Sequence, residues 1–269
     1  MLELANVSKT YRGGARALGH TSLSIEAGQV TVLLGPSGAG KSTMLRCMNL
    51  LTTPSTGVVR ADGLASLDSR RTLRQHRRQT GMVFQQHQLI VRYTALRNVL
   101  MARVGYQPLW RGLVPASRAD ERIALEALDQ VGLLYKAMYR ADLLSGGEQQ
   151  RVGIARALAQ QPRLVLADEP VASLDPATAR RVMALLRRVC EENGITLVAS
   201  LHQVDLALAH ADRIIGLAHG EIVYDGPPSE VSESVLSVIY EGATDNAEPV
   251  FPDAGERRAA DVSIATVTH

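Results

Sequence analysis

The sequence predicts an α/β fold, and two observations lead to that prediction. Short apolar runs bounded by glycine alternate with helical patterns along the 269 residues, as strands and helices do in α/β proteins. One long stretch, residues 86–161, interrupts this alternation, because few strand signals occur within it. We therefore expect an α/β core that carries a helical insertion.

The chain before the insertion supplies two predicted strands and a helix. Residues 30–34 (VTVLL) are short, apolar and rich in β-branched side chains, which is typical of a buried strand. Residues 42–51 follow as a predicted helix, and residues 81–84 (GMVF) form the next predicted strand.

The insertion itself is predicted to be helical. Ala124, Ala127, Leu128 and Val131 recur at the spacing i, i+3, i+4, i+7, which places them on one face of an amphipathic helix.

The alternating pattern returns after the insertion. Residues 164–167 (LVLA) form a continuous apolar run, as expected for a strand that is covered on both faces. A helical stripe follows, and Gly194 is well placed to end that helix before a further strand at 195–199. The stripe consists of Val182, Leu185, Leu186 and Val189.

The last part of the chain combines a predicted hairpin with a polar tail. The apolar runs 214–217 and 222–224 flank His219 and Gly220, which suit a hairpin turn. Residues 243–269 are polar and show no sustained period, so we expect a loosely held tail there.

Composition excludes several classes of protein. The 29 basic and 27 acidic side chains leave a net charge of +2, whereas nucleic-acid binders usually show a strong basic excess. The two cysteines, Cys47 and Cys190, are too few for a disulfide scaffold and suit a reducing compartment. No secretory signal is visible, and no apolar run approaches the roughly 18 residues that span a bilayer. Any membrane role is therefore expected to depend on a partner.

Residues 35–42 (GPSGAGKS) fit the pattern of a phosphate-binding P-loop. The motif follows a predicted strand and opens a predicted helix, which is the context that it requires. Glycines allow successive backbone N–H groups to turn toward a phosphate chain, and the helix N-terminus adds about half a positive charge. Lys41 is expected to reach the β- and γ-phosphates, and the Ser42 hydroxyl to ligate Mg²⁺. The alternative is a glycine-rich turn that arose by chance.

Asp168 and Glu169 directly follow the predicted strand at 164–167. A carboxylate at the C-terminal end of a buried strand, beside a P-loop, is placed to hold Mg²⁺. The adjacent Glu169 is then able to orient or deprotonate the attacking water. Taken alone, the pair would equally suit a helix N-cap or an exposed turn.

Residues 144–151 (LSGGEQQR) are the most diagnostic stretch. Ser-Gly-Gly before a helical pattern predicts another anion-binding helix N-terminus, or else a simple N-cap followed by a solvated helix face. The octapeptide also resembles the signature motif of the ATP-binding cassette (ABC) ATPases, a family that combines it with a P-loop upstream and Asp-Glu downstream. The resemblance covers about residues 2–242.

Four further motifs of that family have matches in this sequence. Tyr11 resembles the aromatic residue that stacks on adenine, although alone it would suit a packed strand. Gln85 matches the glutamine that senses Mg²⁺ and water, and its neighbour Gln86 is the residue with which it could be confused. Ser173 and Asp175 match the D-loop at the dimer interface. His202 matches the switch histidine at the γ-phosphate, and would otherwise be an ordinary turn residue.

The resemblance implies a fold and a set of site residues. It implies a P-loop NTPase core with a RecA-like mixed sheet, an N-terminal antiparallel β subdomain and the helical subdomain at about 86–161. Glu169, His202 and Gln85 are expected to be catalytic, and Ser42, Gln85 and Asp168 to bind the metal. In trans, across a homodimer, Ser145, Gly146, Gly147 and Glu148 are expected to act on the bound nucleotide. The nucleotide-binding residues are expected to be Tyr11, Gly35, Pro36, Ser37, Gly38, Ala39, Gly40, Lys41, Ser42 and Thr43.

A closer resemblance indicates the transport system. Residues 104–111, 141–144 and 201–205 are similar to the ATPase subunits of phosphonate importers. This similarity implies ATP and Mg²⁺ as cofactors, two integral membrane permease subunits, an extracytoplasmic solute-binding protein and a location on the cytoplasmic face of the bacterial inner membrane. Trp110, the only tryptophan, is then expected either to contact the permease or to pack inside the subdomain.

Two other functions were weighed against import. A soluble ABC ATPase that remodels a nucleic-acid or enzyme complex often carries two cassettes or a long coiled coil, and neither is present. A regulatory nucleotide switch would lack the catalytic carboxylate, whereas Glu169 is present. The basic cluster at residues 70–78 lies on a predicted helix without interleaved aromatic residues, so we expect a solvated face and no nucleic-acid partner.

Overall fold

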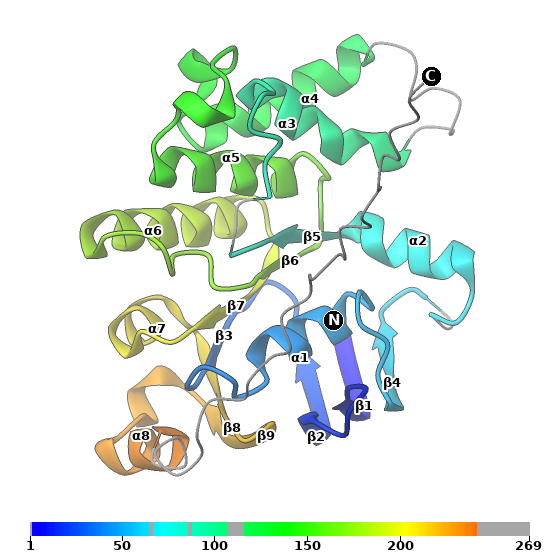
Figure 1. Ribbon diagram of the computed structural model, residues 1–269, viewed down its shortest axis with the longest axis vertical. Coiled ribbons are helices and arrows are strands. Elements are labelled where there is room, and N and C mark those ends of the chain that lie inside the picture. The colour runs from blue at the N-terminus through cyan, green and yellow to red at the C-terminus, as the bar shows by residue number, and fades with distance from the viewer. Residues whose placement is uncertain (1, 65–66, 86–87, 107–115, 241–269) are drawn as a thin grey trace, which may run out of the picture.

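The computed structural model describes residues 2–64, 67–85, 88–106 and 116–240. The predicted tail at 243–269, Trp110 and Gln86 lie outside these described residues. Figure 1 shows the helices of the middle of the chain gathered at one end of the molecule and the first strands at the other, with a second sheet between them. This arrangement confirms the α/β fold.

The central sheet has six strands in the order β5-β6-β7-β3-β8-β9. Every neighbouring pair is parallel except β8 and β9, which form the predicted antiparallel hairpin. Parallel strands end at the same edge, so the residues that follow β3, β5, β6 and β7 gather there. The strands are β3 (Val30–Leu34), β5 (Thr80–Val83), β6 (Leu164–Ala167), β7 (Thr196–Leu201), β8 (Arg213–Ala218) and β9 (Glu221–Gly226).

The second sheet is antiparallel and has three strands in the order β2-β1-β4, in agreement with the N-terminal β subdomain that the family resemblance implied. It comprises β1 (Leu2–Thr10), β2 (Arg16–Ile25) and β4 (Thr56–Ala61). The register shifts between Leu4 and Val7 on β1, which interrupts the alternation of inward and outward side chains.

Helices cover the remaining surfaces. The α-helices are α1 (Lys41–Met48), α2 (Arg70–Gln79), α3 (Ala95–Leu100), α4 (Arg118–Gln130), α5 (Gly146–Leu158), α6 (Pro176–Glu192), α7 (Val204–His210) and α8 (Glu233–Tyr240). Short 3-10 helices are η1 (Met101–Tyr106), η3 (Leu134–Lys136), η4 (Ala141–Leu143) and η5 (Pro228–Glu230).

Two apolar cores lie on opposite faces of the central sheet. Alternate residues of one strand enter different cores, as Val32 and Leu33 of β3 do. One core joins that sheet to α1 and the antiparallel sheet, and the other joins it to helices α3–α7. Burial on both faces explains why the central strands are continuous apolar runs.

Several predicted boundaries differ from the structure. The helix predicted at 42–51 ends at Met48, because Leu50 adopts a left-handed backbone with φ of 50° that turns the chain. The strand predicted at 81–84 is shifted by one residue. The strand predicted at 195–199 continues to Leu201, since Leu201 pairs with Leu34 of β3.

Within the described ranges, no helix is both long enough and apolar enough to cross a membrane.

Candidate nucleotide-binding site

The P-loop, residues 35–40, connects β3 to α1 at the edge where the parallel strands end. Its first and last glycines are required by close packing. A Cβ atom at Gly35 would lie 2.3 Å from the carbonyl oxygen of Leu217, and one at Gly40 would lie 2.5 Å from that of Ala17. Gly40 also has φ of 100°, a conformation that favours glycine. The β8–β9 hairpin supports the loop, because the Gly220 amide donates a 3.1 Å hydrogen bond to the Ala39 carbonyl.

Lys41 begins α1 and is folded back across its own loop. Its Nζ donates hydrogen bonds to the carbonyl oxygens of Gly35 at 2.7 Å and Pro36 at 2.8 Å. Burial lowers the pKa of Lys41, while the negative charges of Glu169 and Asp168 act in the opposite direction. In the described part of the chain, no carboxylate lies within ion-pair distance of Nζ. The arrangement leaves a buried cation that a phosphate oxygen would neutralise.

Asp168 lies directly after β6 and is almost fully buried. Its Oδ1 accepts hydrogen bonds from the hydroxyls of Ser42 at 2.6 Å and Ser200 at 3.1 Å. Its Oδ2 lies 3.7 Å from the guanidinium of Arg46. The sequence-predicted pair Ser42 and Asp168 is therefore brought together, although the two residues are 126 positions apart.

The Ser42 and Asp168 oxygens suit a magnesium ion. Mg²⁺ prefers hard oxygen ligands and is usually held by one or two protein groups together with phosphate oxygens and water. No group of three or more His, Cys, Asp or Glu side chains in the described ranges could hold a metal unaided. The donor set thus fits an ion that arrives with a nucleotide rather than a site built from protein ligands alone.

Ser200 is a site residue that sequence reasoning missed. It lies near the end of β7, is fully buried, and its hydroxyl accepts a 2.9 Å hydrogen bond from the Glu169 amide while donating to Asp168. Glu169 adopts a left-handed backbone with φ of 45°, so this bond stabilises a strained turn. The available signal was a polar residue in an otherwise apolar strand next to β6.

Gln85 and His202 follow the two strands that flank β6. Gln85 lies two residues beyond β5, and His202 lies one residue beyond β7. Both side chains are exposed, and among the described residues neither hydrogen-bonds to Asp168 or Glu169. The strand order gathers them at the same edge, but leaves them free to contact a ligand.

Tyr11 lies beside the P-loop helix. It follows β1 directly, its side chain is exposed, and its hydroxyl is 3.4 Å from Oγ1 of Thr43 in the first turn of α1. The ammonium of Lys9 lies 5.3 Å from the centre of its ring. The alternative of a packed strand tyrosine is therefore wrong, because the exposed Tyr11 side chain lies next to the first turn of α1.

Ser145 is the N-cap of α5, as its sequence context predicted. Its hydroxyl accepts a 3.4 Å hydrogen bond from the Glu148 amide, and the Ser145 amide donates a 3.0 Å bond to the Glu148 carboxylate. Lys136 Nζ lies 2.6 Å from the same carboxylate, and this hydrogen bond lowers the pKa of Glu148. The start of α5 is thus rigidly organised.

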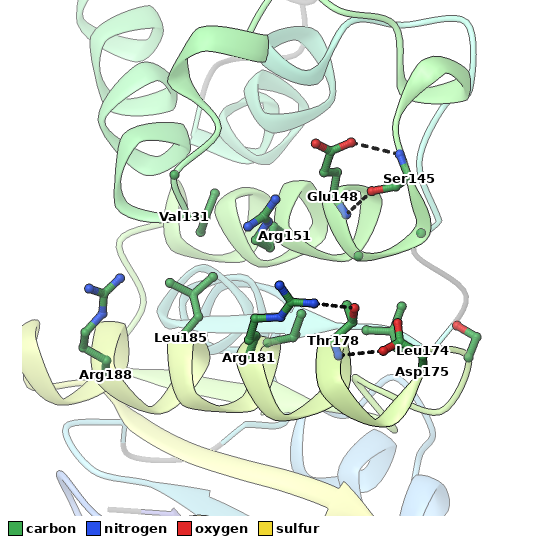
Figure 2. Close-up of a pocket in the computed structure, with 15 residues that line it drawn as sticks. Val131, Ser145, Glu148, Arg151, Leu174, Asp175, Thr178, Arg181, Leu185 and Arg188 are labelled. Carbon is green, nitrogen blue, oxygen red and sulfur yellow. Dashed lines mark hydrogen bonds between the residues drawn. The ribbon is translucent and has the colours of Figure 1, made fainter.

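The D-loop packs against the start of α5. A Cβ atom at Gly147 would lie 2.7 Å from Thr178 Cγ2, and one at Gly146 would lie 3.7 Å from Leu174. Asp175 caps α6 by accepting hydrogen bonds from the amides of Ala177 and Thr178 at 3.1 Å and 3.0 Å. Figure 2 shows the N-termini of α5 and α6 side by side.

A cavity of about 640 Å³ opens between these two helices. Figure 2 shows Arg151, Arg181 and Arg188 along it, farther from the N-termini of the two helices than Ser145 and Glu148. Among the described residues, no hydrogen bond or ion pair joins residues 145–148 to the P-loop or to Asp168 and Glu169. The predicted site residues therefore form two separate groups, which we call the P-loop half-site and the signature half-site.

Comparisons with known proteins agree with this geometry. Residues 18–172 match the family described as "ABC transporter". The chain is 55% identical over 243 residues to the phosphonates import ATP-binding protein PhnC 3 of Nostoc sp., covering 90% of this chain and 93% of that protein. It is also 55% identical to the phosphite import ATP-binding protein PxtA of Stutzerimonas stutzeri, over 90% of this chain and 88% of that protein.

A similar solved structure is a dimeric, post-hydrolysis state of the ATP-binding cassette MJ0796 bound to ADP and Pi. It has a TM-score of 0.74 and 38% identity, and the match covers 85% of this chain and 99% of that one.

Proposed function

Because this chain belongs to the ABC transporter family of ATP-binding proteins, we propose that it hydrolyses ATP to energise the import of a phosphonate or a related phosphorus oxyanion. The observation that carries the ATPase proposal is the contact between Ser42 and Asp168 beside the buried cation of Lys41. The relatives are named as import proteins for phosphonate and phosphite, which disfavours a soluble remodelling ATPase.

The P-loop half-site binds the nucleotide. The amides of residues 35–40 and the Lys41 ammonium hold the phosphate chain, and Tyr11 stacks on the base. Ser42, Asp168 and Gln85 would hold Mg²⁺, which would neutralise charge that develops on the phosphates. Lys41 exchanges its two carbonyl partners for phosphate oxygens, so its buried ammonium gains charged acceptors in place of neutral ones.

The residues that follow β6 and β7 act on the terminal phosphate. The carboxylate of Glu169 orients the attacking water and accepts its proton, and His202 contacts the γ-phosphate. Ser200 fixes the positions of Glu169 and Asp168 relative to each other, since its hydroxyl accepts from the Glu169 amide and donates to the Asp168 carboxylate. Phosphoryl transfer requires positioning more than covalent chemistry, which suits a site built from fixed strand ends.

The signature half-site acts in trans in a homodimer. Among the described residues, no hydrogen bond or ion pair joins its residues 145–148 to their own P-loop, and they line an open cavity. A similar cassette is dimeric in its post-hydrolysis state. Ser145 and Gly147 of one subunit, with Gly146, Glu148 and the D-loop residues Ser173 and Asp175, therefore close on ATP held by the other. Hydrolysis removes the bridging γ-phosphate and lets the subunits part.

An exposed apolar surface supports docking to the permease. Here the segment at 91–93 lies against the segment at 141–142, which leads into the signature motif, and the Asp142 amide donates to the Val91 carbonyl at 3.1 Å. A permease helix that bound to this surface would contact both segments. Movement of that helix would therefore be coupled to both half-sites. Its exposed side chains are Ile90, Val91, Leu134, Tyr135, Met138, Tyr139 and Leu143.

The complete transporter would contain two such ATPase subunits, two integral membrane permeases and an extracytoplasmic solute-binding protein. The chain would sit at the cytoplasmic face of the inner membrane through its permeases. The solute contacts belong to the other components, so the phosphorus oxyanion is proposed from the relatives and not from this site.

Growth on defined phosphorus sources tests the proposal. A strain from which the gene is deleted is expected to grow on inorganic phosphate but not on methylphosphonate or phosphite as sole phosphorus source. The wild-type gene should restore growth, whereas a Glu169→Gln allele should not, because import requires turnover. Undiminished growth of the deletion strain on both compounds would contradict the proposed solute class.

A further inference from the structure

Helix α8 reaches the strand end that carries His202, although it lies outside the matched family segment 18–172. Its anchor is Ile239, which is fully buried against β8. Gly216 of β8 leaves room for that side chain, since a Cβ atom there would lie only 2.6 Å from Ile239 Cδ1. The fit fixes the position of α8 on the sheet.

The next residue, Tyr240, contacts the main chain of His202. Its half-buried phenol donates a 3.0 Å hydrogen bond to the His202 carbonyl oxygen. Within the described ranges this is the only side-chain hydrogen bond made to His202. The following residue, Gln203, is the N-cap of α7, and its side chain makes no capping hydrogen bond among the described residues. The turn is therefore not stabilised by a side-chain cap.

The strand end is therefore held at two points. Ser200 binds Asp168 and Glu169 on the side of β6, and Tyr240 binds His202 two residues later. The His202 side chain is exposed, so its reach toward a γ-phosphate depends on where the backbone places its Cα atom. A bond at the adjacent carbonyl restricts the backbone torsions that move this atom.

We propose that Tyr240 is a positioning residue for ATP hydrolysis, which holds the His202 main chain in place for the γ-phosphate. Helix α8 thereby becomes part of the hydrolytic machinery, and a partner that displaced α8 would slow turnover without touching the nucleotide. The inference rests on the proposed contact of His202 with the γ-phosphate.

Tyr240→Phe tests the inference, because it removes the hydroxyl and keeps the ring that packs in place. With the ATPase purified together with its permeases, kcat is expected to fall roughly 3–10-fold, the range for one lost hydrogen bond. The KM for ATP and the melting temperature should stay unchanged, since no P-loop contact is altered. A purely structural role would not separate kcat from KM in this way.

Tyr224→Phe is the matched control. Tyr224 also packs near α8, but its hydroxyl donates to the Pro227 carbonyl at 2.7 Å instead of to His202. This variant should keep the wild-type kcat. An unchanged kcat for Tyr240→Phe, or an equal loss for Tyr224→Phe, would overturn the inference.

His202→Ala separates this inference from the proposed function. If His202→Ala loses turnover while Tyr240→Phe retains it, the positioning role fails and the proposed mechanism stands. If His202→Ala itself retains wild-type turnover, the γ-phosphate contact proposed for His202 fails, and the role of Tyr240 fails with it.

Discussion

At the scale of single residues, one buried hydroxyl links the two carboxylate residues of the proposed active site. Ser200 can donate one hydrogen bond and accept others, and it uses both capacities: it donates to Asp168 and accepts from the Glu169 amide. The bond to Glu169 offsets part of the cost of its left-handed backbone. Removing the hydroxyl would leave a buried N–H group without its partner.

We expect Ser200→Ala to lower kcat by about tenfold, because losing a buried hydrogen-bond partner costs roughly 1–3 kcal/mol. ATP affinity, measured with a fluorescent nucleotide, should change little, since Lys41 and the P-loop are untouched. Thr31→Val is the control: Thr31 lies on the adjacent strand β3, and its buried hydroxyl has no hydrogen-bond partner among the described residues. Equal turnover in both variants would argue against the role of Ser200.

Motif spacing indicates the residues proposed to bind phosphate, but not the residues that support them. Lys41 and Ser42 belong to a loop whose glycines leave a pattern in the sequence, and the structure places Ser42 on Asp168. Ser200 and Arg46 belong to no pattern, because their role depends on which strand and helix lie beside β6. Contacts of this kind arise only when the chain is folded.

At the scale of elements, α2 supports the C-terminal end of the P-loop helix α1. The ring Nε2 of His76 is 2.8 Å from the Met48 carbonyl, and Arg77 donates to the Asn49 and Leu50 carbonyls. These side chains satisfy carbonyl groups that a helix end leaves without partners. Arg74 and Arg78 likewise donate to the Gly105 carbonyl. The basic cluster predicted to be a solvated face thus contains arginines that hold neighbouring backbone in place.

Burial of His76 makes this support sensitive to pH. Desolvation lowers the pKa of His76, the charge of Arg77 acts in the same direction, and the bond to Met48 acts against them. In the unfolded chain His76 binds a proton near pH 6.5, whereas in the folded protein it binds that proton only at lower pH. The free energy of unfolding should therefore fall as the pH drops below about 6.5.

Thermal unfolding at pH 7.5 and pH 5.5 measures the effect. His76→Gln, which keeps a donor for the Met48 carbonyl, should lose less stability between these two values than the wild type. Burial also lowers the pKa of His210, and comparing the two proteins isolates His76 because both keep His210. The same pH dependence in both proteins would show that His76 does not titrate as described.

Elements buried on both faces of the sheet were the easiest to predict. The bounds of β3 and β6 agree with the sequence prediction, because continuous apolar runs end sharply at polar or glycine residues. The N-terminal antiparallel strands β1, β2 and β4 were expected only from the family resemblance. Register shifts along β1 break the alternation that would otherwise have revealed them. The early end of α1 depends on Leu50, whose left-handed backbone leaves no compositional signal.

At the scale of the whole molecule, the fold separates two half-sites that a single chain does not join. The P-loop and the carboxylates lie at the edge of the central sheet, while the signature motif and the D-loop line the cavity between α5 and α6 (Figure 2). In the function proposed here, a second copy of the chain provides the other half for each nucleotide. The sequence predicted the members of both half-sites, but only the folded chain shows that, among the described residues, no hydrogen bond or ion pair joins residues 145–148 to the P-loop or to the side chains of Asp168 and Glu169.

The central claim is that two copies close around ATP and that hydrolysis separates them. Light scattering coupled to size-exclusion chromatography of the Glu169→Gln variant measures this most directly, since the variant should bind MgATP without cleaving it. The 29.0 kDa chain is expected to double in mass with MgATP, and to stay single with MgADP or when Lys41→Ala is added. A Glu169→Gln protein that binds MgATP and still elutes as a single chain would contradict the account.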